Sequence, residues 1–278
     1  MFRRKKAPRV GLALSGGGAR GLAHIGVLKV FEEQKLPIHA LAGSSMGGLI
    51  AAAYAAGMSA SELEVAALKM TNLRELAALV DFRPPRRGLL DGEHVREYLA
   101  KFVDEDLTFA ELKLPLAMQA VDLKSGKEHT LREGNLLDAV MATSAFPGVF
   151  PPVEIQGLQL VDGGVLDNLP TELPRRLGAD IVIAVYVTAM VDTDQEDEQT
   201  DRVIKYGIAK DIMRVTLIVS RAMTEAKLRE APPDLLLCPS IPAKAGVFSG
   251  FTHAAEIIAA GETCAREYLD KIIKITSA

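Results

Sequence analysis

The chain has 278 residues, of which 49% are hydrophobic and 24% are charged, so it can bury a large core in a single α/β domain. Its formal net charge of -4 excludes the broad positive surface that proteins use to bind nucleic acid. No run of about 18 apolar residues occurs in the sequence, which excludes a membrane-spanning helix. The function must therefore be sought in local motifs.

The first nine residues carry five cations beside Phe2 and resemble the start of a signal peptide. The apolar stretch behind them is interrupted at Ser15 and three glycines, so we expect a solvated basic arm over residues 1–9. Such an arm is a candidate for peripheral contact with anionic lipid headgroups. Cys238 and Cys264 form no paired motif and are predicted to be reduced thiols, as in a cytoplasmic protein.

Two strand–turn–helix units open the chain. Residues 10–14 are a short apolar run that ends in glycines, and residues 19–34 then carry apolar side chains at helical spacing. Residues 37–42 form a second apolar run, followed by an Ala-rich helix over residues 48–56 that Gly57 closes. Successive units of this kind predict parallel strands with helical crossovers. The expected fold is α/β, with a mainly parallel central sheet flanked by helices on both faces.

The remaining segments complete one domain over residues 10–278. Residues 57–112 are predicted to be a helical insert, which is a candidate cover for the site. Further strands are predicted over residues 114–122, 153–161 with a turn at Gln156-Gly157, 181–187 and 235–239. Residues 192–201 are acidic and predict a solvated surface loop.

Two long helices are predicted in the last third of the chain, over residues 204–228 and 252–273. The first is apolar on a broad face and is expected to pack on the sheet through that face. Its apolar residues include Ile208, Ile212, Val215, Leu217, Ile218 and Val219.

The segment from Gly43 to Gly47 has the pattern G-x-S-x-G between a predicted strand and a predicted helix. Gly43 and Gly47 permit a sharp turn, so that the Ser45 hydroxyl projects at the helix N-terminus, where the dipole favours a developing anion. In this context the pattern predicts a nucleophilic serine.

Three consecutive glycines, Gly16, Gly17 and Gly18, lie between the first strand and the first helix. They expose backbone N–H groups without side-chain obstruction, as an oxyanion hole requires. The segment from Gly16 to Gly21 also fits the dinucleotide-binding pattern G-x-G-x-x-G, but the second strand then ends in Gly-Ser-Ser without the acidic residue that holds the ribose. No Gly-Lys-Ser/Thr follows, which also excludes a P-loop.

Asp162 follows another predicted strand and precedes Gly163 and Gly164. An Asp-Gly pair is commonly only a turn, but a nucleophilic serine needs a base, and a carboxylate within hydrogen-bond reach can serve as one. His253 remains a competing candidate, because the order Ser45, Asp162, His253 is that of α/β-hydrolase triads.

Taken together, these motifs resemble those of the patatin-like phospholipase family. The family's G-G-G-x-[RK]-G is present over residues 16–21, its G-x-S-x-G over 43–47 and its D-G-G over 162–164. Residues 142–147 resemble its A-S-x-A-x-P block, with Thr143 in place of the first serine. The match is nearest to small bacterial members without accessory domains.

The resemblance implies a patatin-like three-layer sandwich and a Ser45–Asp162 dyad that cleaves fatty acyl esters of lipids through an acyl-enzyme. It further implies oxyanion donors from Gly16, Gly17, Gly18 and Met46, and a positioning role for Arg20 in the glycine loop. Neither a cofactor nor a metal ion is expected, since no ligand pattern for calcium or zinc occurs. Two alternatives stay open: a triad esterase or thioesterase on soluble esters through His253, and a catalytically silent protein that binds an acyl ligand.

Overall fold

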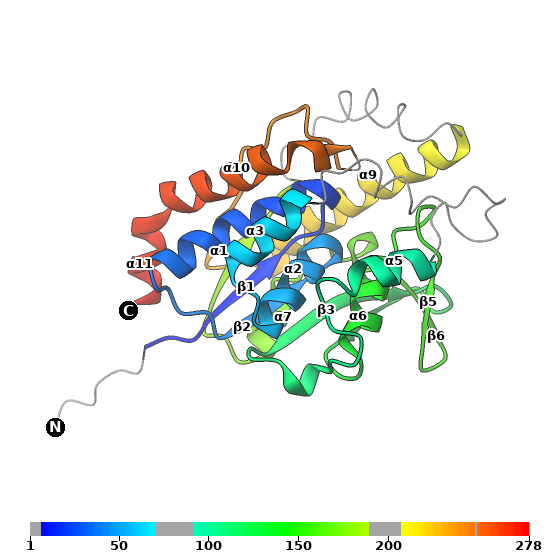
Figure 1. Ribbon diagram of the computed structural model, residues 1–278, viewed down its shortest axis with the longest axis horizontal. Helices are drawn as coiled ribbons and strands as arrows, with labels where there is room; N and C mark the ends of the chain where they lie inside the picture. The colour runs from blue at the N-terminus through cyan, green and yellow to red at the C-terminus, as the bar shows by residue number, and fades with distance from the viewer. Residues whose placement is uncertain (1–6, 70–91, 189–206, 248, 278) are drawn as a thin grey trace.

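The computed structural model describes residues 7–69, 92–188, 207–247 and 249–277 (Figure 1). The predicted acidic loop over residues 192–201 and most of the basic arm lie outside the described residues, as does the central part of the predicted insert. Arg9, at the end of the predicted arm, is anchored to the domain, because its N–H donates to the Asp180 carboxylate at 2.8 Å.

The described strands form one 8-stranded sheet in the order β5-β6-β3-β2-β1-β7-β8, with β4 paired to β3 (Figure 1). Their bounds are β1 Val10–Leu14, β2 Ala40–Gly43, β3 Leu116–Asp122, β4 Lys127–Leu131, β5 Val153–Ile155, β6 Leu158–Asp162, β7 Ile181–Val185 and β8 Leu235–Leu237. Strands β3, β2, β1, β7 and β8 are parallel, whereas β4 and β6 pair antiparallel with β3, and β5 pairs antiparallel with β6. The predicted, mainly parallel sheet is confirmed.

Helices cover both faces of this sheet. Their bounds are α1 Ala23–Glu33, α2 Ser45–Ala56, α3 Ala60–Lys69, α5 Gly92–Leu99, α6 Leu136–Thr143, α7 Glu172–Arg176, α9 Gly207–Glu230, α10 Ala254–Glu267 and α11 Leu269–Thr276, with 3-10 turns η1 Gly18–Leu22, η2 Phe109–Glu111, η3 Gly163–Val165 and η4 Gly250–His253. Alternate residues of β1 separate the two layers: Leu12 and Leu14 point into the main core with α1 and α2, and Ala13 into a smaller core with Leu228 of α9.

The buried side of α9 differs from the sequence-based prediction. Four of the aliphatic side chains expected to pack on the sheet are exposed, by 42% to 59%: Ile212, Val215, Ile218 and Val219. The helix instead buries Met213, Ser220 and Thr224, which lie on another side of it. Burial of the Thr224 hydroxyl is possible because its Oγ1 donates to the helix's own Ser220 carbonyl at 2.7 Å.

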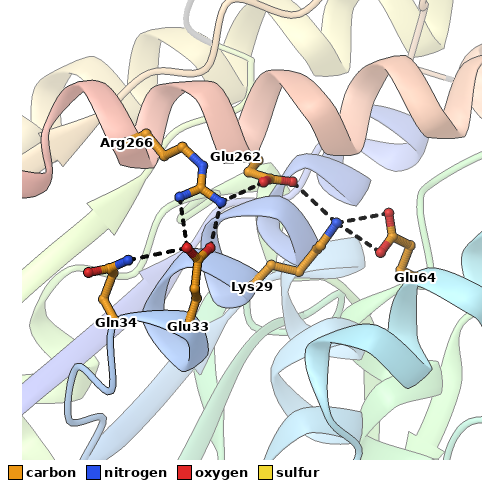
Figure 2. Close-up of polar contacts among 6 residues, drawn as sticks. All are labelled: Lys29, Glu33, Gln34, Glu64, Glu262 and Arg266. Carbon is orange, nitrogen blue, oxygen red and sulfur yellow. Dashed lines mark hydrogen bonds and ion pairs between the residues drawn. The ribbon is translucent and has the colours of Figure 1, made fainter.

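Helices α1 and α10 cross at a point where both lack a side chain. A Cβ atom on Gly261 would lie 1.9 Å from the Ala23 carbonyl oxygen, and one on Gly26 would lie 2.0 Å from that of Ile258. Figure 2 shows the ion pairs beside this crossing. There Lys29 of α1 contacts Glu64 of α3 at 2.9 Å and Glu262 of α10 at 3.2 Å. Close backbone contact therefore sets the spacing of the two helices. The partly exposed ion pairs of Lys29 lie beside this contact.

Candidate active site

The predicted nucleophile lies at a sharp turn from β2 into α2. Ser44 is extended, with φ of -130°, and Ser45 follows in the left-handed region with φ of 51°. Such a conformation is strained for a serine, and it persists where the surroundings enforce it. One restraint is Thr143 Oγ1, which accepts a hydrogen bond from the Ser45 N–H at 3.1 Å. The helix thus begins at Ser45 itself, earlier than the predicted residue 48.

The two glycines of the serine motif allow the turn to pack against β1. A Cβ atom on Gly47 would lie 2.3 Å from the Leu14 carbonyl oxygen, and one on Gly43 would lie 2.6 Å from the Gly47 backbone. The Ser44 N–H donates to the same Leu14 carbonyl at 3.2 Å. The start of α2 is therefore held directly over the carboxyl end of β1.

Asp162 meets Ser45 because two strands end facing each other along β3. Strand β2 runs parallel to β3 and ends with Gly43 opposite Met118, while β6 runs antiparallel and ends with Asp162 opposite Ala120. Since β4 occupies the other side of β3, β2 and β6 share one side and their ends converge. Residues that are more than a hundred positions apart in the sequence are joined in this way.

The Asp162 carboxylate is buried, with 1% of the residue exposed. Its Oδ1 accepts a hydrogen bond from the Gly164 N–H at 2.7 Å, whereas Oδ2 has no hydrogen-bond partner among the described residues. Burial raises the pKa of Asp162 to about 6, although the Ser45 hydroxyl, the Gly164 N–H and the Ser44 hydroxyl each favour the charged form. A carboxylate with a raised pKa and a free oxygen beside a serine hydroxyl is suited to accept a proton.

Gly163 fixes the turn that carries Asp162. A Cβ atom on Gly163 would lie 2.3 Å from the Gln119 carbonyl oxygen of β3. The Asp162 N–H, in turn, donates to the Ala145 carbonyl at 3.0 Å. The Asp-Gly-Gly turn is therefore attached both to the sheet and to the segment that follows α6.

The glycine loop lies against Ser45. A Cβ atom on Gly16 would lie 3.0 Å from that of Ser45 and 2.3 Å from Oδ1 of Asn168. The Gly16 N–H donates to the Asn168 carbonyl at 3.0 Å, which differs from the expectation that Gly16 is an oxyanion donor. Gly17 and Gly18 show no such bond from their N–H groups to the described backbone. Gly16 thus anchors the loop.

Met46 is the residue after the serine and is half-buried in the first turn of α2. Backbone N–H groups in a first helical turn have no intrahelical acceptor. The Met46 side chain packs on Gly21, whose Cβ atom, if present, would lie 2.4 Å from Met46 Cγ. The N–H groups of Gly17, Gly18 and Met46 therefore come from two elements that adjoin at Ser45.

Arg20 is buried, with 2% of the residue exposed. Its Nε donates to the Val187 carbonyl at 3.1 Å and its Nη1 to the Ala245 carbonyl at 3.0 Å. The guanidinium therefore ties the glycine loop to two other segments. His24 is also buried there, and burial lowers its pKa to about 4, so the neutral ring donates from Nε2 to the Ser15 carbonyl at 2.8 Å.

His253, the competing base, is engaged at the start of α10. Its Nδ1 lies 3.2 Å from Oε1 of Glu256, which also pairs with Lys244. The rings of His24, His39 and His253 contact the Ser15 carbonyl, the Val10 N–H and the Glu256 carboxylate, respectively. Within the part of the chain that the structure describes, no three His, Cys, Asp or Glu side chains gather as metal ligands.

Comparison with known proteins identifies the family. Its sequence model, described as patatin-like phospholipase, matches residues 12–174, which contain all four motifs. The chain belongs to this family. An uncharacterised NTE family protein of Mycobacterium tuberculosis is 38% identical over 183 residues, covering 66% of this chain and 50% of that protein. The human patatin-like phospholipase domain-containing protein 6 is 34% identical over 191 residues, covering 66% of this chain and 14% of that protein.

The chain thus spans half or less of the length of these relatives. Among solved structures, VipD from Legionella pneumophila resembles this patatin-like chain with a TM-score of 0.54 and 13% identity, over 96% of this chain and 67% of VipD. That likeness concerns the fold alone. No described helix is long and apolar enough to cross a membrane.

Thr143 contributes to the site in a way that its position in the motif does not indicate. Its hydroxyl accepts from the Ser45 N–H and donates to the Gln119 carbonyl at 2.6 Å, so both functions of the hydroxyl are used. A serine at this position, as in the family's A-S-x-A-x-P block, offers the same oxygen. The motif indicates that position 143 carries a hydroxyl, as serine or threonine. The tertiary fold determines that this hydroxyl accepts from the Ser45 N–H.

Proposed function

We propose that this chain is a serine acyl hydrolase that cleaves fatty acyl esters of lipids, with Ser45 as nucleophile and Asp162 as base. The observation that carries the proposal is the buried Asp162 carboxylate beside the strained Ser45 turn, whose Oδ2 has no hydrogen-bond partner in the part of the chain that the structure describes. Membership of the patatin-like phospholipase family supports a lipid ester as the substrate.

In the first half-reaction, Ser45 Oγ attacks the ester carbonyl carbon while its proton passes to Asp162. The N–H groups of Gly17, Gly18 and Met46 stabilise the negative charge on the carbonyl oxygen, and the α2 dipole adds to them. When the tetrahedral intermediate collapses, the carbon–oxygen bond to the leaving alcohol breaks, and the alcohol takes the proton from Asp162. The acyl group remains on Ser45.

In the second half-reaction, water attacks the acyl-enzyme and gives a proton to Asp162. The new tetrahedral intermediate expels Ser45 Oγ, which recovers that proton, and the fatty acid leaves. No step requires a histidine, in keeping with the pairing of His253 to Glu256. Each oxyanion donor removed from such a site typically costs about 2.7 to 4 kcal/mol of barrier.

Labelling with a fluorophosphonate tests the nucleophile, with Ser45→Ala as the matched control. We expect labelling of the wild type alone, together with hydrolysis within a panel of phospholipids, lysophospholipids and short nitrophenyl esters. A folded wild-type protein that neither labels nor hydrolyses any member is a silent acyl-binding protein. Hydrolysis confined to the soluble esters favours the esterase alternative.

A second pair of variants separates the dyad from a triad. Asp162→Asn is expected to lose activity by the factor of about 10² to 10⁴ that is typical of proton-transfer catalysis. His253→Ala is expected to keep more than about a tenth of the wild-type kcat/KM, a barrier change below roughly 1.4 kcal/mol. An inactive, folded His253→Ala protein beside an active Asp162→Asn protein refutes the dyad.

Peripheral membrane contact through the basic arm is a separate part of the proposal. Each cation near an anionic surface contributes about 1 kcal/mol, and residues 1–9 carry five. Deletion of residues 1–8, which leaves the anchored Arg9, is expected to reduce co-sedimentation with anionic liposomes. If the full chain and the shortened protein co-sediment equally, the basic arm does not contact the membrane.

A further inference from the structure

An apolar pocket of ≈ 190 Å³ lies between α5, the end of α6 and the segment that leads into β5. Figure 1 shows these three elements side by side at one end of the molecule. Ser144 is the one polar residue of its lining. The apolar lining includes Val95, Leu99, Met141, Phe150 and Val153.

The position of α5 over this pocket is specified by the sequence of the helix. Val95 and Leu99 are one turn apart, so they lie on the same face, and both are nearly buried. Arg96, next to them, forms an ion pair with Asp138 in the first turn of α6. This pair joins the two helices while their apolar side chains line the space between them.

The pocket adjoins the catalytic pair through three consecutive residues. Thr143 accepts a hydrogen bond from the Ser45 N–H, and the Ala145 carbonyl accepts one from the Asp162 N–H. Ser144, between them, lines the pocket, and consecutive Cα atoms are about 3.8 Å apart. Ser144 of the pocket lining is therefore bonded directly to the two residues that hold the backbones of Ser45 and Asp162 in place.

We propose that this pocket binds the acyl chain of the ester whose carbonyl carbon Ser45 attacks. The inference rests on the proposed function and adds a substrate class to it, namely esters of medium-chain fatty acids. An apolar lining in which Ser144 is the one polar side chain among the described residues matches a hydrocarbon chain that carries a single polar end.

The volume sets the chain length. A cavity of about 150 Å³ holds the six carbons of benzene, so the ≈ 190 Å³ pocket holds about seven carbons. Each buried methylene contributes about 0.8 kcal/mol, which corresponds to about a fourfold gain in kcat/KM. The gain ends when the pocket is full, so longer chains bring no further increase.

Hydrolysis of nitrophenyl acetate, hexanoate, decanoate and palmitate tests this directly. For the wild type, we expect kcat/KM to rise from acetate to decanoate and then to level off or fall. Met141→Trp fills the pocket and is expected to lower the decanoate-to-acetate ratio at least tenfold. Leu123→Trp, the matched control on an exposed turn, is expected to leave that ratio within about twofold.

An unchanged ratio in a folded Met141→Trp protein overturns the pocket assignment while the hydrolase function stands. If Met141→Trp does not fold, Leu99→Ala gives the opposite test, because a larger pocket shifts the preferred chain to greater length. No shift in that variant overturns the assignment.

A binding measurement separates failure of the pocket from failure of the proposed function. Calorimetric titration of decanoate into the Ser45→Ala protein requires no catalysis, and we expect saturable binding that Met141→Trp added to Ser45→Ala abolishes. If wild type hydrolyses no ester but decanoate binds in this way, the proposed function fails and the pocket assignment stands. Absence of decanoate binding overturns the pocket assignment.

Discussion

Thr143 Oγ1 accepts a hydrogen bond from the Ser45 N–H across 3.1 Å and thereby holds the strained turn at Ser45. Thr143→Val keeps the shape of the side chain but leaves a buried N–H without an acceptor, at a cost of about 1 to 3 kcal/mol. We expect chemical denaturation to show this loss, together with a lower kcat. Thr143→Ser retains the oxygen and should restore both; if valine and serine behave alike, the hydrogen bond has no role.

The strain at Ser45 predicts an unusual response to glycine. Both Ser45→Ala and Ser45→Gly remove the hydroxyl of the proposed nucleophile and are expected to be inactive. Within a helix, glycine is normally about 1 kcal/mol less stable than alanine, but at φ of 51° the left-handed conformation costs alanine about 1 to 2 kcal/mol. We therefore expect Ser45→Gly to unfold at the same or a higher denaturant concentration than Ser45→Ala. Ala56→Gly, in the last turn of the same helix, is the control. There we expect the glycine variant to be the less stable one, as is usual within a helix.

The raised pKa of Asp162, about 6, predicts the pH dependence of hydrolysis. Only the carboxylate accepts a proton, so kcat/KM should fall about tenfold per pH unit below 6 and level off above it. Burial also raises the pKa of Asp167 to about 6, despite its ion pair with Lys227 at 3.1 Å. Asp167→Asn therefore provides the control. If that variant loses the inflection near pH 6, the titrating group is Asp167 and not Asp162.

The same burial predicts that Asp162 lowers the stability of the fold at neutral pH. Its pKa in the folded state is raised from 3.8 to about 6, so the folded state binds more protons than the unfolded state between these values. The free energy of unfolding must then decrease as pH rises through this window. Asp162→Asn should be more stable than wild type at pH 8, by on the order of 1 to 3 kcal/mol, with the difference vanishing near pH 4. Thermal unfolding of both proteins at the two pH values measures this; a wild type that is the more stable one at pH 8 contradicts it.

The crossing of α1 and α10 predicts a large effect of one methyl group. In Gly261→Ala, the new Cβ atom would lie 1.9 Å from the Ala23 carbonyl oxygen, so the helices must separate. We expect a loss of about 2 kcal/mol or more in urea denaturation, although alanine favours helix formation. Thr263→Ala, on the exposed side of the same helix, should change stability by less than about 0.5 kcal/mol. Similar values for the two variants would show that the helices adjust freely.

Features that depend only on neighbouring residues can be predicted from the amino-acid order. Apolar runs followed by glycines gave the positions of β1 and β2, and Gly57 ends α2 as predicted, with φ of 114°. The hairpin of β5 and β6 turns at Gln156 and Gly157, both at positive φ, because adjacent residues determine a tight turn. Ser45 and Asp162 were predicted from motifs whose residues are consecutive, and their catalytic roles stay predictions.

The way in which these elements come together depends on contacts between distant segments. The convergence of β2 and β6 on one side of β3 depends on strand pairing between distant segments, and β4, which occupies the other side, was not predicted. The Gly16 N–H is committed to Asn168, a contact between residues 152 positions apart in the chain. The sequence likewise does not determine which side of α9 is buried, because apolar residues are spread around the helix. The neighbouring elements determine which side is covered. Periodicity reports which residues can be buried, whereas long-range backbone contacts fix which of them are.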